Sequence, residues 1–517
     1  MDKKTLNKID NGYLMPKFTS FKEMKLEASD DKGLLYTPDW LKSAIIVEVR
    51  LDTASTDGTL KGAIPILDHY REMGVNCLWI TPVNEMGTGL KNPNGYTNNG
   101  IDTIDPRLTG TDDYEEGWKR FGKFVDEAHK RDIRILLDVV IWGVDKEAPI
   151  INEHPEYFKH DENGNIIQNM WGGPSYDVEG EAFRKWYKHH IVKIVEVTGI
   201  DGYRLDLEPA YAGYDFWADI RKTCRDKGMP IVIMSEHRSH RGAAFDFEQY
   251  GVMDHLHYDY YCEETMVRYN VGPKSDSQVL ASGEPVNYWL TGIEGRDIVS
   301  TTKSGSFYTG KEPNYEIAQE MQREGKTGDD RFYTYCLTNH DIPYHGTPSV
   351  IRFGYQAIFA PVFPVWMMGD ETHCIERNLG NCLYYTAKML TKVDETCDYY
   401  DFYEDVKKMI AIRRQNADVF EYFPNNHRET NIDYVTVEGL KSYTPYCRYN
   451  DNKVIMVIPN GTEQDADIKV VLPSQAKGFN TNTAKELLRD TKIRSTQGNL
   501  NLKITAGDMA VILIEKN

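Results

Sequence analysis

Four acidic residues of this chain lie in or directly after short apolar runs. They are Asp138 in IRILLDVV, Asp206 in GYRLD, Glu236 after PIVIMS and Asp341 in YCLTNHD. Carboxylates that converge on one place repel one another, so a cluster of them is costly unless it serves catalysis or binds a metal. A single one of them could instead cap a helix or pair with an arginine. The four together predict a chemical site if the fold brings the ends of these runs to one place.

The segments around these acids alternate between strand and helix patterns. The β-branched run IIVEVR (45–50) precedes the helical pattern LKGAIPILDHYREMG, which precedes the apolar run VNCLWITPV (75–83). Two strands with a helix between them pair in parallel. A second helix is predicted after Thr111 as its N-cap, with Asp112 and Asp113 in the first turn, and strand 133–140 follows it. Later strands are predicted within GIDGYRLDLEP, PIVIMSEHRS, FYTYCLTNHD and APVFPVWMMGDE.

The repeated pattern predicts the α/β class, with a (β/α)8 TIM barrel over residues 36–425. The carboxyl ends of all strands share one mouth in such a barrel, and that mouth would gather the acids. Residues 141–180 interrupt the pattern, are rich in Asn, Gly, His and Pro, and predict an inserted subdomain after the third strand. Segment 258–330 is predicted as a long loop excursion.

The two ends of the chain differ from the barrel segment. Residues 1–35 are polar and weakly patterned, and they are predicted to form an N-terminal leader. A last helix is predicted over Asp401–Phe420. Short strands separated by turns then dominate, so residues 430–517 predict a C-terminal antiparallel β-sandwich domain.

The composition excludes several kinds of partner. The formal net charge of the 517 residues is −19, which disfavours nucleic acid and anionic membrane surfaces and fits a neutral substrate. No apolar run is long enough for a membrane span, and the polar start MDKKTLNKIDNGYL shows no secretory signal, although a trimmed signal would leave the same picture. The eight cysteines are scattered without a C-x-x-C pair. These features predict a cytoplasmic protein with reduced thiols.

Several blocks of the sequence resemble motifs of the α-amylase family, glycoside hydrolase family 13. GYRLD (Gly202–Asp206) is similar to the block of the fourth strand, IMSEH (Ile233–His237) to that of the fifth, and LTNHD (Leu337–Asp341) to that of the seventh. GDE (Gly369–Glu371) after the eighth strand is also similar to the family. Each block alone is weak evidence, but their order and spacing make the resemblance specific over about residues 36–517.

The resemblance implies the roles of the carboxylates. Asp206 is expected to be the nucleophile, Glu236 the general acid/base and Asp341 the third carboxylate of a retaining mechanism, in which the first two act about 5 Å apart. Arg204 leaves the same strand two residues before Asp206 and shares its face, so it is expected either to keep Asp206 ionised or to form a structural salt bridge.

The resemblance also implies substrate contacts. His340 and Asp341 resemble the ligands of the sugar hydroxyls at the cleavage subsite, and Asp138 is the retained acid of the third-strand block. Tyr96 in NGYTNNG resembles the aromatic platform under the sugar ring, with a core tyrosine as the alternative.

The sequence departs from the family at two places. The third-strand block of the family reads D-x-x-x-N-H, whereas DVVIWG has Trp142 and Gly143 in place of the Asn and the His. Trp142 is therefore predicted to line a differently built substrate site, and the calcium ion that the Asn ligates in the family is expected to be absent. No other cofactor is expected. After the nucleophile, LEPAY (Leu207–Tyr211) replaces the usual pattern, and Glu208 is expected either to contact substrate or to cap a helix.

These features predict a retaining glycoside hydrolase that cleaves α-glucosidic bonds of starch-type glucans or malto-oligosaccharides. A transglycosylase is the alternative, because HPEYF (His154–Phe158) is similar to a stretch of maltosyl-transferring relatives. A non-catalytic glucan-binding protein is less favoured, since no catalytic carboxylate is lost. A metal-dependent hydrolase would have to use His237, His240, His255 and His257, but no H-x-H motif lies on the first strand. The linkage, the substrate length and the oligomeric state are left open.

Overall fold

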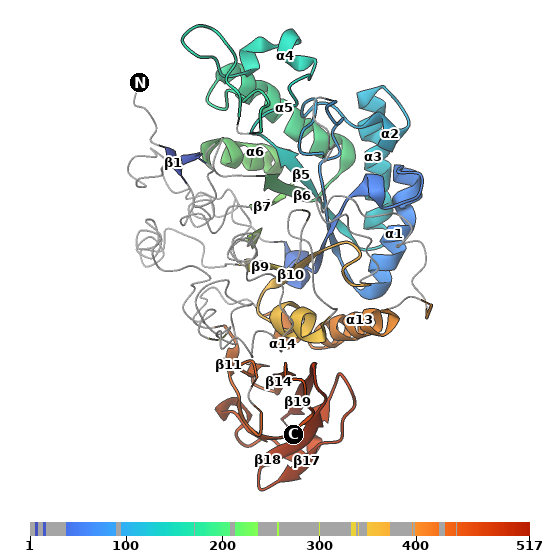
Figure 1. Cartoon of the computed structure of the whole chain (residues 1–517), viewed down its shortest axis with the longest axis vertical. Coiled ribbons are helices and arrows are strands. Elements are labelled where there is room, and N and C mark those ends of the chain that lie inside the picture. Colours follow the sequence, from blue (N-terminus) through green and yellow to red (C-terminus); the bar gives the residue numbers. More distant parts are fainter. Residues whose placement is uncertain are drawn as a thin grey trace.

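The structure is a computed structural model in which the following residues are described: 6–8, 14–16, 38–88, 95–169, 171–206, 212, 214–235, 256–257, 299, 332–337, 340, 349–372, 395–396, 399–422, 430–440 and 442–516. Figure 1 shows the barrel strands with helices around them, and a separate body of strands that contains the C-terminus.

Eight parallel strands form a closed barrel in the order β10-β3-β4-β5-β6-β7-β8-β9. Their bounds are β3 (Ile46–Val49), β4 (Cys77–Ile80), β5 (Arg134–Val140), β6 (Gly202–Asp206), β7 (Val232–Ser235), β8 (Leu256–His257), β9 (Phe332–Cys336) and β10 (Phe363–Met367). The predicted (β/α)8 fold is confirmed. The sequence patterns did not include the sixth strand, β8, because two paired residues are too short to show a period.

Helices follow the strands and bury their apolar faces against the barrel. They are α1 (Leu60–Met73), α2 (Pro106–Thr109), α3 (Tyr114–His129), α5 (Glu181–Thr198), α6 (Tyr214–Asp226), the π-helix η5 (Ile351–Ile358), α13 (Tyr400–Gln415) and α14 (Ala417–Phe420). The N-cap of α1 is Thr59, whose side chain accepts a hydrogen bond from the Gly62 N–H, and its C-cap is Gly74 in the left-handed conformation (φ 88°).

Two expectations about helix ends are wrong. The N-cap of α3 is Asp113, whose carboxylate accepts hydrogen bonds from the N–H groups of Glu115 and Glu116, whereas Thr111 accepts one from Asp113 outside the helix. The predicted helix 401–420 is two helices, α13 and α14, separated at Asn416. The Asn416 side chain donates to the Ile412 carbonyl at 2.9 Å, so it satisfies a backbone group at the end of α13.

The segment after β5 forms the inserted subdomain. It contains α4 (Ile150–Glu153) and the 3-10 helix η4 (Pro155–Tyr157). Isolated β-bridges join Gly143 to Ser175, Phe158 to Tyr176, His160 to Ile166 and Gln168 to Pro174. These bridges fold residues 158–176 back onto the end of β5, next to the mouth of the barrel.

The C-terminal part consists of two antiparallel sheets around a core of its own. One sheet has the order β11-β13-β14-β19-β16 and the other β12-β15-β18-β17. The strands are β11 (Ile432–Tyr434), β12 (Thr436–Glu438), β13 (Tyr446–Tyr449), β14 (Lys453–Asn460), β15 (Ala466–Val471), β16 (Lys485–Glu486), β17 (Arg494–Thr496), β18 (Asn499–Ile504) and β19 (Asp508–Glu515). Side chains that alternate along these strands, such as Ile468 and Val470, fill the space between the sheets.

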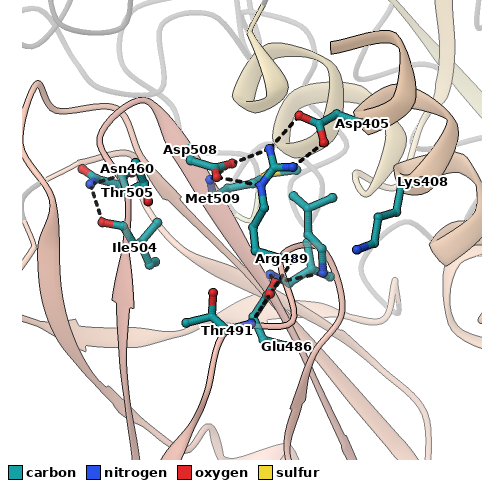
Figure 2. A network of polar contacts seen from close by, with 12 residues as sticks. Asp405, Lys408, Asn460, Glu486, Arg489, Thr491, Ile504, Thr505, Asp508 and Met509 are labelled. Carbon is teal, nitrogen blue, oxygen red and sulfur yellow. Dashed lines mark hydrogen bonds and ion pairs between the residues drawn. The ribbon is translucent and has the colours of Figure 1, made fainter. Parts of the chain in front are cut away.

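An arginine connects the C-terminal sheets to the barrel (Figure 2). Arg489 binds both carboxylate oxygens of Asp405 on α13, and its Nε donates to Asp508 on β19 at 2.7 Å. The backbone N–H of Arg489 donates to Glu486, whose buried carboxylate also accepts from the N–H of Val511. The Arg489 guanidinium is therefore bound both by a carboxylate of α13 and by a carboxylate of the C-terminal sheets.

Shorter elements complete the description. In the N-terminal segment β1 (Leu6–Lys8) and β2 (Leu14–Pro16) pair in antiparallel fashion. Further 3-10 helices are η2 (Asp39–Ser43), η3 (Leu51–Thr53), η8 (Ser474–Ala476) and η9 (Thr481–Thr483). Among the helices in the described ranges, none combines the length and the apolar character that a membrane crossing requires.

Candidate active site

The register of β5 and β6 places three charged residues side by side at the mouth of the barrel. Asp138 pairs with Arg204, and Val140 pairs with Asp206. Residues two apart on a strand share a face, so Arg204 and Asp206 point the same way. The Arg204 Nη1 donates to Asp206 Oδ1 at 2.8 Å and to Asp138 Oδ1 and Oδ2 at 3.1 and 3.0 Å. A single guanidinium nitrogen therefore serves two carboxylates.

Asp138 is fully buried and accepts hydrogen bonds from three residues on neighbouring elements. Besides Arg204, the Trp79 indole donates at 2.9 Å and the Tyr96 hydroxyl at 2.7 Å, both to Oδ2. Burial raises the pKa of Asp138 to about 7; the charge of Asp206 adds to this effect, and Arg204 and the Tyr96 hydroxyl oppose it. The guanidinium of Arg204 also lies 4.6 Å from the centre of the Trp79 ring.

Tyr96 and His340 form a stacked pair beside these charges. Their ring centroids are 4.5 Å apart and nearly parallel, at 20°. The Nδ1 atom of His340 lies 2.5 Å from Glu48 Oε1 on β3, and the His340 backbone N–H donates to Glu48 Oε2 at 3.1 Å. The buried Glu48 carboxylate thus fixes the orientation of His340, which lies on the seventh-strand motif.

Trp142 brings the loop after β5 into the site. Its indole Nε1 donates to Asp206 Oδ2 at 2.7 Å, and its ring packs on Trp171 of the inserted subdomain with centroids 4.3 Å apart. At the next position a Cβ on Gly143 would lie 2.2 Å from the Pro174 carbonyl oxygen. The backbone of the inserted subdomain therefore occupies the space that any side chain at position 143 would need.

The described residues contain one part of the predicted site. Asp138, Arg204, Asp206, Tyr96, His340 and Trp142 are brought together by the contacts above. Glu236, Asp341 and Glu208 lie outside the described residues, as do His237, His240 and His255. HPEYF lies in the inserted subdomain, where His154 stacks on Tyr157 and Tyr157 on Trp186.

Sequence reasoning missed three residues of the site, Glu48, Trp79 and Trp171. Glu48 and Trp79 lie within apolar strands and looked like barrel core. An acid in the middle of IIVEVR was an available signal, because a buried charge needs a partner. Trp171 lies in a Gly-rich segment, and only the fold of the subdomain places it against Trp142.

The donor set of the described site does not resemble a metal centre. Within the described ranges, no group of three or more His, Cys, Asp or Glu side chains is arranged to hold a metal ion. At the position of the calcium-ligating Asn of the family, the Trp142 side chain presents an N–H donor, which binds Asp206. A hard cation requires oxygen ligands, so this side chain does not fit the ion.

Comparisons with known proteins point to one family. Residues 27–165 match the family model of the α-amylase catalytic domain. Trehalose-6-phosphate hydrolase of Bacillus subtilis is 25% identical over 208 residues, covering 32% of this chain and 35% of that protein. Alpha-amylase 2 of Schizosaccharomyces pombe is 26% identical over 247 residues, covering 43% of this chain and 41% of that protein. The chain matches about a third of the length of each of the first curated relatives.

Solved structures share the fold over nearly the whole chain. A maltogenic α-amylase from Thermotoga neapolitana superposes with a TM-score of 0.64 at 18% identity, over 92% of this chain and all of that one. At this identity the likeness shows the fold. The chain is thus similar to the α-amylase family, glycoside hydrolase family 13, in its fold and, over residues 27–165, in its match to the model of the catalytic domain.

Proposed function

We propose that the protein is a retaining glycoside hydrolase that cleaves α-glucosidic bonds in starch-type glucans or malto-oligosaccharides. The observation that carries the proposal is the carboxylate of Asp206 at the end of β6, held by Arg204 on one oxygen and by Trp142 on the other. These two hydrogen bonds fix the plane of the carboxylate. A nucleophile that attacks one carbon atom must be held in such a fixed orientation. The relatives named above include a trehalose-6-phosphate hydrolase and an α-amylase, and their names support this substrate class.

The reaction takes two steps in this proposal. Asp206 attacks the anomeric carbon while the glycosidic bond breaks, and the leaving oxygen takes a proton from Glu236. Water then attacks the same carbon, gives a proton to Glu236 and releases Asp206 as a carboxylate. The roles of Glu236 and of Asp341, the third carboxylate, rest on their sequence motifs.

The described side chains have distinct roles around this reaction. Arg204 keeps Asp206 ionised, because a cation beside a carboxylate favours the charged form. Glu48 orients His340 for contact with a sugar hydroxyl, and Tyr96, stacked on His340, forms part of the same wall. The site uses no organic cofactor in this proposal, and no calcium ion binds at the position of Trp142.

An assay panel tests the proposed function. Maltose, maltotriose, isomaltose, trehalose, pullulan and starch are incubated with the parent and with Asp206→Asn. We expect the substitution to reduce turnover at least about a thousandfold on every active substrate, as loss of a catalytic nucleophile does. Asp226→Asn on the exposed face of α6 is the matched control, since Asp226 pairs there with Lys222. Equal rates for Asp206→Asn and the parent would exclude Asp206 as the nucleophile.

Hydrolysis and transfer to a second sugar differ in the acceptor of the second step. Maltoheptaose products resolved by mass distinguish them, because transfer produces oligomers longer than seven units and hydrolysis only shorter ones. We expect shorter products. The direction in which optical rotation changes while the fresh product mutarotates, or NMR of the first product anomer, checks retention independently of the acceptor.

A further inference from the structure

The two oxygens of the Asp206 carboxylate receive hydrogen bonds from different elements. Arg204 on β6 donates to Oδ1 at 2.8 Å, and the Trp142 indole from the loop after β5 donates to Oδ2 at 2.7 Å. We propose that Trp142 is a positioning residue that makes Asp206 a better leaving group and so speeds hydrolysis of the glycosyl-enzyme. This inference rests on the proposed function, in which Asp206 is the nucleophile.

The charges around Asp206 explain why a second donor matters. The Nη1 atom of Arg204 is shared between Asp206 and the buried Asp138, so one cation is divided between two carboxylates. The indole N–H of Trp142 carries no net charge but adds a donor from another element to Asp206. A hydrogen bond to an ionised acceptor is about twice as strong as one between neutral groups.

The position of Trp142 is fixed by packing. The side chain is buried, forms an apolar cluster with Tyr96 and Val140, and contacts Trp171. The loop is packed closely against the inserted subdomain, because Gly143 lies against the Pro174 carbonyl and Gly173 against the Val144 carbonyl, and an isolated β-bridge joins Gly143 to Ser175. The indole N–H is therefore preorganised toward Asp206 and requires little reorientation during the reaction.

The consequence differs between the two chemical steps. In the first step, Asp206 forms a bond to the anomeric carbon and loses its negative charge, which weakens the hydrogen bond from the indole. In the second step, water forms a bond to that carbon, the bond to Asp206 breaks, and the electron pair returns to the carboxylate. The indole N–H then binds a charge that is growing, so it stabilises the second transition state relative to the intermediate. Without the N–H the second step is slower, and the first is not.

The test removes the N–H group in two variants, of which only the first keeps the bicyclic ring. Trp142 is replaced by β-(3-benzothienyl)alanine, in which sulfur stands in place of the indole nitrogen, and in parallel by phenylalanine. On the best malto-oligosaccharide substrate we expect kcat and KM to fall together by about tenfold, the factor that corresponds to one modest hydrogen bond. We expect kcat/KM to stay within about twofold, and a covalent glycosyl-enzyme to accumulate in acid-quenched samples examined by intact mass.

A matched control is available on α3. Trp118 also donates its indole N–H, to the Asp102 carbonyl at 3.2 Å, away from the Asp206 cluster. Trp118→Phe should change thermal stability but neither kcat nor the amount of covalent intermediate. This control shows how much the loss of an indole hydrogen bond changes the stability of the protein, so that this change can be told apart from an effect on Asp206.

Two results would overturn the inference. In the first, kcat and kcat/KM fall equally at constant KM and no intermediate accumulates, which would assign Trp142 to the first step or to substrate orientation. In the second, the benzothienyl protein has the parent's kinetics. Either result, combined with an inactive Asp206→Asn, rejects this inference alone, whereas an active Asp206→Asn rejects the proposed function itself.

Discussion

At the scale of single residues, the site depends on how buried charges are paired. The sequence predicted that Arg204 and Asp206 share a face, and the hydrogen bond between them confirms the geometry. It could not show that Arg204 is shared with Asp138, because that contact depends on the register between β5 and β6. The acid in IIVEVR indicated that Glu48 needs a partner, but the sequence could not show that this partner is His340, which is 292 positions away. Pairings between distant strands follow from barrel closure and are not visible in local patterns.

The pKa of Asp138 gives a prediction about pH and stability. Burial raises this pKa from 3.8 to about 7 in the folded protein. A carboxyl whose folded pKa is raised contributes stability that is fully present below pH 3.8 and is lost as the pH rises through about 7. In Asp138→Asn this contribution is absent at every pH. The advantage in Tm of the parent over Asp138→Asn should therefore shrink from pH 5 to pH 8, as measured by circular dichroism. A constant difference would mean that Asp138 stays ionised over this range.

At the scale of elements, the loop after β5 differs most from the family pattern. The composition predicted the inserted subdomain at 141–180, whereas the differently built site near Trp142 was expected from the resemblance to the family, whose third-strand block the chain does not keep. The sequence could not predict that the hairpin around Pro174 packs on Gly143, because this depends on how the subdomain folds back. The two helix ends that were wrong, at Asp113 and Asn416, have the same origin. Several nearby polar residues suit a cap, and the three-dimensional path of the chain selects one of them.

The same loop gives a prediction about calcium. The Trp142 side chain presents an N–H group where the family ligates the ion with an amide oxygen, and that N–H donates to Asp206. We expect the Tm of protein dialysed against EDTA to be unchanged by millimolar calcium. An ion that bound the folded state at a hundred times its Kd would add about 2.7 kcal/mol and raise the Tm. Magnesium at equal ionic strength is the control. A rise in Tm with calcium alone would contradict the prediction.

At the scale of the whole molecule, two junctions hold the chain together. The barrel closes where β10 pairs with β3, and there the buried Glu371 of the GDE motif accepts hydrogen bonds from Tyr70 on α1 and Trp366 on β10. The second junction joins the C-terminal sheets to α13 through Arg489 (Figure 2). The order of the barrel and the C-terminal sheets along the chain was visible in the change from helical to strand patterns. The two junctions were not visible, because each joins elements that are far apart in sequence.

The junction at Arg489 gives a prediction about how the two parts unfold. Arg489→Ala removes the two-pronged contact with Asp405 and the contact with Asp508, and these side chains are partly exposed to solvent. We expect a loss of about 1–2 kcal/mol of coupling, because exposed ion pairs contribute little singly and more in a network. In calorimetry the C-terminal sheets should then unfold at a lower temperature than the barrel. Lys408→Ala is the matched control at the same junction, since Lys408 reaches Asp490 only at 3.4 Å on the exposed side, and it should change the Tm far less. The effect of Arg489→Ala should shrink in high salt, which screens charge pairs. Equal effects of the two substitutions would show that apolar packing between the sheets and η5, not Arg489, holds this junction.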